Sequence, residues 1–113
     1  MRCVCVPVLA AAGFLVAGTA QAEPSAANGR ALFVKVGCYE CHGYQGQGGA
    51  AGPRIAPDPL PFDGLAAFVR TSSGEMPPYT TTLLSDGDLA DIYAYLQSIP
   101  RPPALADLPL LKP

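Results

Sequence analysis

The spacing of apolar residues downstream of the N-terminal segment predicts three amphipathic helices. Residues 26–36 are expected to form the first, with Ser25 as its N-cap. Gly29 and Phe33 stand four positions apart, so they share one face of this helix. Gly37 follows at a position where helices commonly end in a left-handed residue, so we expect the helix to end there.

A second helix is predicted after Asp63, which can serve as its N-cap. Leu65, Phe68 and Val69 fall on one side of it, at the spacings i, i+3 and i+4. The run Ser72-Ser73-Gly74 closes the helix, because these residues favour caps and turns over helix interiors.

The third predicted helix has the clearest boundaries. Ser85, followed three residues later by Asp88, forms a capping box in which aspartate replaces the usual glutamate. Pro100 ends the helix because its ring cannot continue the hydrogen-bond ladder. A 3.6-residue period marks the expected apolar face, which consists of Leu89, Ile92, Tyr93, Leu96 and Ile99.

The segments between and after these helices are predicted to be irregular. Residues 43–61 are rich in glycine and proline and lack hydrophobic periodicity. Residues 75–79 contain two consecutive prolines, which forbid a regular helix and stiffen the chain. Residues 101–113 carry further prolines and several leucines, and we expect an extended tail that lies over the domain or over a partner. The predicted fold class is therefore small and all-α.

The first 22 residues are typical of a cleaved secretory signal peptide. Arg2 supplies the positive start, residues 6–17 form an apolar run, and small residues precede a cleavage site after Ala22. A membrane anchor fits less well, because the run falls short of the ~20 apolar residues that span a bilayer. Cys3 and Cys5 would leave with the signal. We expect an exported, periplasmic protein without membrane insertion after cleavage.

The mature chain divides into a domain, residues 23–100, and the Pro-rich tail, residues 101–113. Without Arg2, the chain has six basic and nine acidic residues, which gives a formal net charge of minus three. Nucleic-acid binding would require a clustered basic face, so no nucleic-acid partner is expected. A domain this short commonly needs a disulfide, a metal or a cofactor to complete its core.

The sequence Cys38-Tyr39-Glu40-Cys41-His42 is the principal chemical signal. A C-x-x-C-H motif is typical of covalent haem attachment, in which each thiol adds to a porphyrin vinyl group and the histidine ligates iron. Structural zinc usually requires four ligands, but residues 23–113 contain no further cysteine or histidine. A redox disulfide would require a βαβ frame for which we find no strands. One covalent haem c is therefore the favoured interpretation.

Met76 is the expected second ligand of the iron. It is the only methionine after the predicted cleavage site, and no second histidine exists. It lies in a loop that contains glycine and proline rather than on an apolar helical face, where a methionine would be core filler. A His42/Met76 pair would raise the reduction potential and suit an electron carrier.

Residues 29–99 together resemble a class I, single-haem cytochrome c. The motifs that carry the resemblance are Cys38–His42, Gly52-Pro53, Met76-Pro77-Pro78-Tyr79 and the helix that contains Leu89, Ile92, Tyr93, Tyr95 and Leu96. The resemblance implies three main helices and loops wrapped around one covalent haem. The chain departs from the family pattern in the short interval between His42 and Met76 and in its lack of tryptophan.

The resemblance also implies roles for individual residues. Gly29 and Phe33 would pack crosswise against Tyr93, and the Pro53 carbonyl would accept the second ring N–H of His42. A haem propionate would be held by Tyr79, Tyr44 or Arg54, with ordinary pocket packing as the other role for the tyrosines.

The expected function is single-electron transfer between redox partners. The chain would be a free carrier between a dehydrogenase and a terminal oxidase, or the electron-accepting subunit of a periplasmic dehydrogenase. Its acidic residues are dispersed, and Asp86, Asp88 and Asp91 are explained by a helix N-terminus, so no catalytic residues are predicted. The alternative is a haem enzyme or gas sensor in which Met76 is not bound.

Overall fold

A computed structural model describes residues 22–109 of the chain. The described part contains four α-helices, a 3-10 turn and no strand, which confirms the all-α prediction. The helices are α1 (Ala26–Lys35), α2 (Cys38–His42), α3 (Phe62–Thr71) and α4 (Asp86–Ser98), followed by η1 (Leu105–Asp107). Apart from Ala22, the predicted signal peptide lies outside the described residues.

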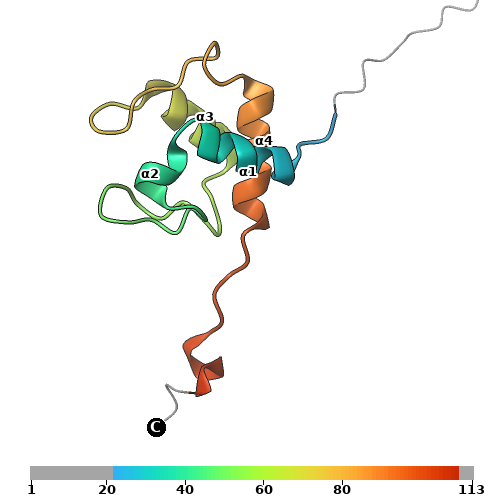
Figure 1. Ribbon diagram of the computed structural model, residues 1–113, viewed down its shortest axis with the longest axis vertical. Helices are drawn as coiled ribbons and strands as arrows, with labels where there is room; N and C mark the ends of the chain where they lie inside the picture. Colours follow the sequence, from blue (N-terminus) through green and yellow to red (C-terminus); the bar gives the residue numbers. More distant parts are fainter. Residues whose placement is uncertain (1–21, 110–113) are drawn as a thin grey trace, which may run out of the picture.

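Helices α1 and α4 make the main helix–helix contact (Figure 1). Gly29 permits it, because a Cβ at this position would collide with the backbone carbonyl of Asp91 and lie 2.8 Å from the nitrogen of Ile92. Phe33, one turn further on, is completely buried and meets the ring of Tyr95 edge to face at 5.7 Å. The expectation that Tyr93 fills this role is wrong.

Local sequence signals set the ends of α1 and α4. The Ser25 hydroxyl accepts a hydrogen bond from the backbone N–H of Asn28, as its N-cap role predicts. At α4, Ser85 and Asp88 form the predicted reciprocal capping box. The buried residues of α4 are Leu89, Ile92, Tyr95 and Leu96.

Helix α3 differs from its prediction at the N-terminus. It begins at Phe62, after Pro61, and no side chain caps it. Asp63 is therefore not the N-cap but lies in the first turn, where its charge favours the helix dipole. Helix α3 ends at Thr71, before the predicted serine cap.

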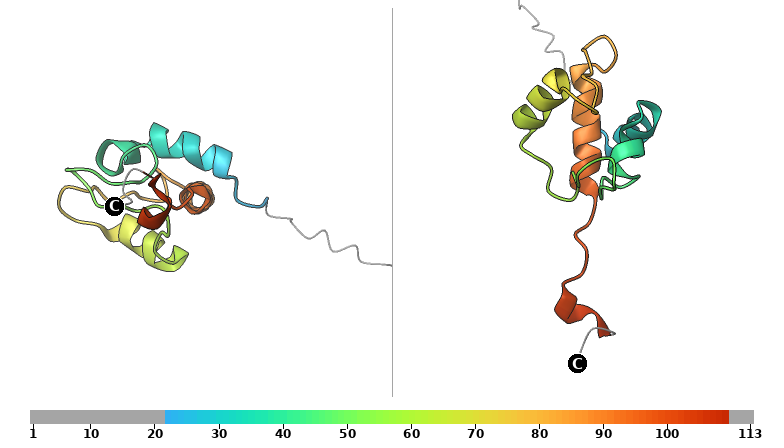
Figure 2. Two further views of the ribbon diagram at one scale, coloured as in Figure 1. Left: turned by 90° about the horizontal axis from the view of Figure 1, so that it is seen from below. Right: turned by 90° about the vertical axis from the view of Figure 1, so that its left-hand side faces the viewer.

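Helices α2 and α3 lie on opposite sides of α4 (Figure 2), and residues of all three helices line one space. The predicted loops, residues 43–61 and 75–79, contain no helix and border this space. Residues 101–109 run away from the helices, and their expected packing over the domain is not observed (Figures 1 and 2). Arg101 at the start of the tail forms an ion pair of 2.6 Å with Asp58. No helix among the described residues has the length and apolarity needed to cross a membrane.

Candidate functional site

The Cys-x-x-Cys-His motif forms helix α2, a single short turn that sequence periodicity could not detect. Gly37 precedes it in the left-handed conformation, with φ of 84°, so the chain turns sharply out of α1. On this one turn, Cys38, Cys41 and His42 line the same cavity. The structure thus brings the three motif residues together.

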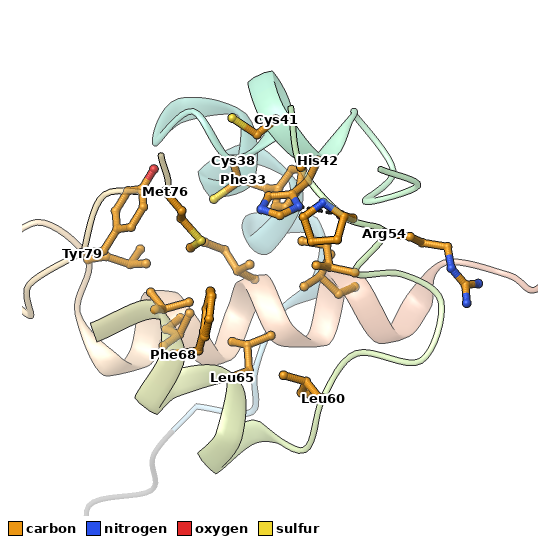
Figure 3. A pocket seen from close by; sticks show the side chains of 18 of the residues that line it. Phe33, Cys38, Cys41, His42, Arg54, Leu60, Leu65, Phe68, Met76 and Tyr79 are labelled. Carbon is orange, nitrogen blue, oxygen red and sulfur yellow. Dashed lines mark hydrogen bonds between the residues drawn. The ribbon is translucent and has the colours of Figure 1, made fainter. Parts of the chain in front are cut away.

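The cavity has a volume of about 390 Å³, which is in the range of small-molecule and cofactor sites. Its walls come from all four α-helices and from the loops between them (Figure 3). They are mostly apolar, and the lining side chains include Phe33, Ile55, Leu60, Leu65, Phe68, Val69, Leu84, Leu89, Ile92 and Leu96. Phe68 and Leu60 remain 56% and 60% exposed because they lie at the rim of this space rather than in the packed core.

His42 is buried and has a fixed orientation. Its Nδ1 lies 2.8 Å from the carbonyl oxygen of Pro53, as the resemblance implied. A carbonyl can only accept, so Nδ1 carries the hydrogen and Nε2 keeps its lone pair for a metal. The hydrogen bond therefore prepares the imidazole to ligate iron.

Met76 reaches into the same cavity from the loop between α3 and α4 (Figure 3). Tyr79, three residues later, also lines the cavity, and its hydroxyl donates to the carbonyl of Val36 at 2.9 Å. Burial is the main cause that raises the pKa of Tyr79, so its hydroxyl remains a donor at neutral pH. Tyr79 therefore packs in the wall of the cavity, with its hydroxyl bound to Val36.

Cys38 and Cys41 are both half-buried at the cavity. Burial raises the pKa of the Cys38 thiol to about 11, in spite of a lowering contribution from a backbone N–H. Neither Cys38 nor Cys41 is in a disulfide. Within residues 22–109 no group of three or more potential metal-ligating side chains forms a cation site.

The other propionate candidates are separated by the structure. Tyr44 does not line the cavity but stacks on Tyr39, with ring centres 4.7 Å apart. Arg54 does line it, next to Pro53, and its side chain is exposed. Sequence reasoning missed Leu60 and Leu84 as lining residues, because each is an isolated apolar residue in an irregular segment without periodicity.

The residues fit a haem. Two thiols separated by one helical turn stand beside an oriented imidazole, and a thioether enters the same apolar cavity. When bound there, haem c supplies an iron that gains or loses one electron. The fold and this donor set define the class of small helical c-type haem proteins.

Comparisons with known proteins agree with this class. The family described as cytochrome c oxidase, cbb3-type, subunit III matches residues 24–96. The chain is also 33% identical over 93 residues to the cytochrome c subunit of 4-cresol dehydrogenase (hydroxylating) from Pseudomonas putida. The aligned region covers 81% of this chain and 79% of that protein. No solved structure matches the chain.

The chain belongs to the class I cytochrome c family. Family membership confirms the resemblance and makes haem c its cofactor. Haem c thus replaces the zinc and disulfide interpretations of Cys38 and Cys41.

Proposed function

We propose that this protein is a periplasmic single-haem cytochrome that accepts single electrons as a subunit of a dehydrogenase. The observation that carries the proposal is the convergence of Cys38, Cys41, His42 and Met76 on one apolar cavity. Cys38 and Cys41 would hold the haem through thioethers, and His42 and Met76 would ligate its iron. Both ligands would stay bound during electron transfer, so no substrate pocket is needed.

The lining of the cavity supports electron transfer over catalysis. Among the described residues that line it, none is a carboxylate, and the His42 ring is already committed to Pro53. Apolar walls exclude water and favour a high reduction potential. Arg54 is the lining residue best suited to hold a propionate, because its exposed guanidinium can form two parallel hydrogen bonds with a carboxylate.

The dehydrogenase partner is inferred from the relative in Pseudomonas putida, which is a dehydrogenase subunit along nearly the same length. The proline-stiffened segment of residues 101–109, which lies away from the helices, supports this form over the free carrier, because an extended apolar segment can bind a groove of a partner at little entropic cost. A terminal oxidase would then receive the electron directly or through another carrier.

The reaction of the reduced protein with carbon monoxide tests the electron-transfer proposal. We expect no binding at neutral pH, because Met76 would occupy the position on the iron at which carbon monoxide binds. Rapid and complete binding would contradict the proposal and support the alternative, a haem enzyme or gas sensor with an open site.

Purification of the native complex tests the partner. We expect the cytochrome to elute with a dehydrogenase subunit whose substrate reduces the haem. Elution as a free monomer that no such subunit reduces would support the free carrier instead.

N-terminal sequencing of the exported protein should give Glu23 as its first residue, and retention of Met1 would contradict cleavage after Ala22.

A further inference from the structure

Arg70, in the last turn of α3, joins three parts of the molecule through one guanidinium. Its Nη1 donates to the backbone carbonyl of Tyr79 at 2.8 Å, and its Nη2 donates to Oδ1 of Asp86 at 2.7 Å. The Arg70 side chain is only 18% exposed, whereas that of Asp86 is 81% exposed. The guanidinium therefore links α3, the loop after Met76 and the first residue of α4.

Tyr79 is the point at which this loop is fastened. Besides the bond from Arg70, its backbone N–H donates to the carbonyl of Val69 at 2.9 Å. Its hydroxyl donates to the carbonyl of Val36 at 2.9 Å, which ties the loop to the end of α1. Tyr79 is thus hydrogen-bonded both to α3 and to the end of α1.

The segment that carries Met76 has no comparable attachment of its own. Within the described chain, no hydrogen bond joins residues 73–78 to another segment, and their turn at Gly74 and Glu75 is local. Pro77 and Pro78 have no backbone N–H, so Tyr79 is the first residue after Met76 that can donate one from the main chain. The same prolines stiffen the link between Met76 and Tyr79.

We propose that Arg70 is a positioning residue that keeps Met76 directed into the cavity through the Tyr79 carbonyl. The inference rests on the proposed His42/Met76 ligation and adds to it a residue that never touches the haem. The planar fork of Arg70 serves two acceptors in fixed directions, whereas a lysine is a single point charge that cannot reproduce both bonds.

Imidazole binding to the oxidised, haem-loaded Arg70→Lys variant tests the inference. Imidazole reaches the iron only when Met76 has left it, so its apparent affinity reports the fraction of protein in which the loop is open. Loss of one charge-assisted hydrogen bond should raise the affinity about tenfold, equivalent to about 1.4 kcal/mol. Arg30→Lys is the matched control, because Arg30 is exposed on α1 and we expect wild-type affinity.

Tyr79→Phe provides a second variant should Arg70→Lys fold poorly. It removes only the hydroxyl bond to Val36 and should also tighten imidazole binding, by about threefold to tenfold for a neutral hydrogen bond. Wild-type affinity in folded Arg70→Lys would overturn the role of Arg70 while leaving His42/Met76 ligation intact, and wild-type affinity in Tyr79→Phe would show that Tyr79 does not fasten the loop through its hydroxyl. A wild-type protein without the far-red band of methionine-bound iron would instead overturn the proposed ligation, and this inference with it.

Discussion

At the scale of single residues, the site depends on side chains whose positions are fixed by backbone carbonyls. Pro53 orients His42, and Val36 receives the hydroxyl of Tyr79. A carbonyl acceptor does not ionise, so these contacts hold the imidazole and the phenol without adding charge to an apolar cavity.

Met76→Ala should leave the haem attached but change its chemistry. A thioether ligand raises the potential, so we expect a fall on the order of 0.1 V, within the ~0.8 V range over which axial ligands act. A redox titration measures it, and Leu83→Ala, at an exposed position outside the cavity, is the control. An unchanged potential would remove Met76 from the iron.

Asp91 supplies a pH-dependent contribution to stability. Its carboxylate accepts from the Asn28 side chain at 2.7 Å and from the Ser25 backbone N–H at 2.6 Å, and these bonds lower its pKa below the ordinary 3.8. Since the unfolded chain protonates at the higher pKa, the stabilisation is present above about pH 4 and lost as pH falls through the lower folded pKa.

We therefore expect Asp91→Asn to unfold more easily than the wild type at pH 7. The difference should shrink below about pH 4, as protonation removes the same contribution from the wild type. Urea unfolding at several pH values measures it, with Asp107→Asn, an exposed acid in the tail, as the control. A difference independent of pH would contradict the titration of Asp91.

At the scale of elements, the α1–α4 crossing sets the geometry on which the cavity depends. The crossing is close because Gly29 presents no side chain to the backbone of Asp91 and Ile92. Phe33 and Tyr95 then fill the space beside it.

Gly29→Ala should lower the free energy of unfolding by about 2–3 kcal/mol, because its Cβ collides with backbone that cannot move without separating the helices. Gly64→Ala is the matched control in α3, where no atom lies within 4 Å of a built Cβ. The control should gain up to about 1 kcal/mol from helix propensity. Equal effects at both positions, measured by urea unfolding, would contradict the close crossing.

The sequence predicted those elements whose signals are local. Ser25, Ser85 and Asp88 defined helix starts because capping involves neighbours in the chain. Tyr95 was not predicted as a buried residue, because it lies off the single apolar face that the helical period marks on α4. Its ring contacts Phe33, and its hydroxyl donates to the carbonyl of Tyr44 at 2.7 Å. A single helical period describes only one contact face.

In the candidate site, too, only the residues with a local or compositional signal could be predicted from the sequence. The C-x-x-C-H motif and the count of methionines pointed to the cavity-lining donors, because these signals need no tertiary information. The role of Arg70 had no sequence signal, since Tyr79 and Asp86 become its neighbours only when α3, the loop and α4 are assembled.

At the scale of the whole molecule, the four α-helices surround one cavity and residues 101–109 stay apart from them (Figure 1). The Arg101–Asp58 ion pair at the base of the tail is exposed, with side-chain exposures of 76% and 53%. Exposed pairs contribute little, so the tail should add little to the stability of the domain.

Removal of residues 101–113 should therefore change the free energy of unfolding by less than about 1 kcal/mol. Arg101→Met in the full chain is the control, because it removes the ion pair alone. A substantially larger loss on truncation would show that the tail packs against the domain in solution.

Ligation of a covalent haem by His42 and Met76 underlies the proposed function. We would test it with the far-red absorption spectrum of the oxidised protein, made in cells that attach haem to C-x-x-C-H motifs. We expect the weak band of methionine-bound ferric iron at neutral pH, and its loss in Met76→Ala. Attached haem without that band in the wild-type protein would show that Met76 does not ligate the iron.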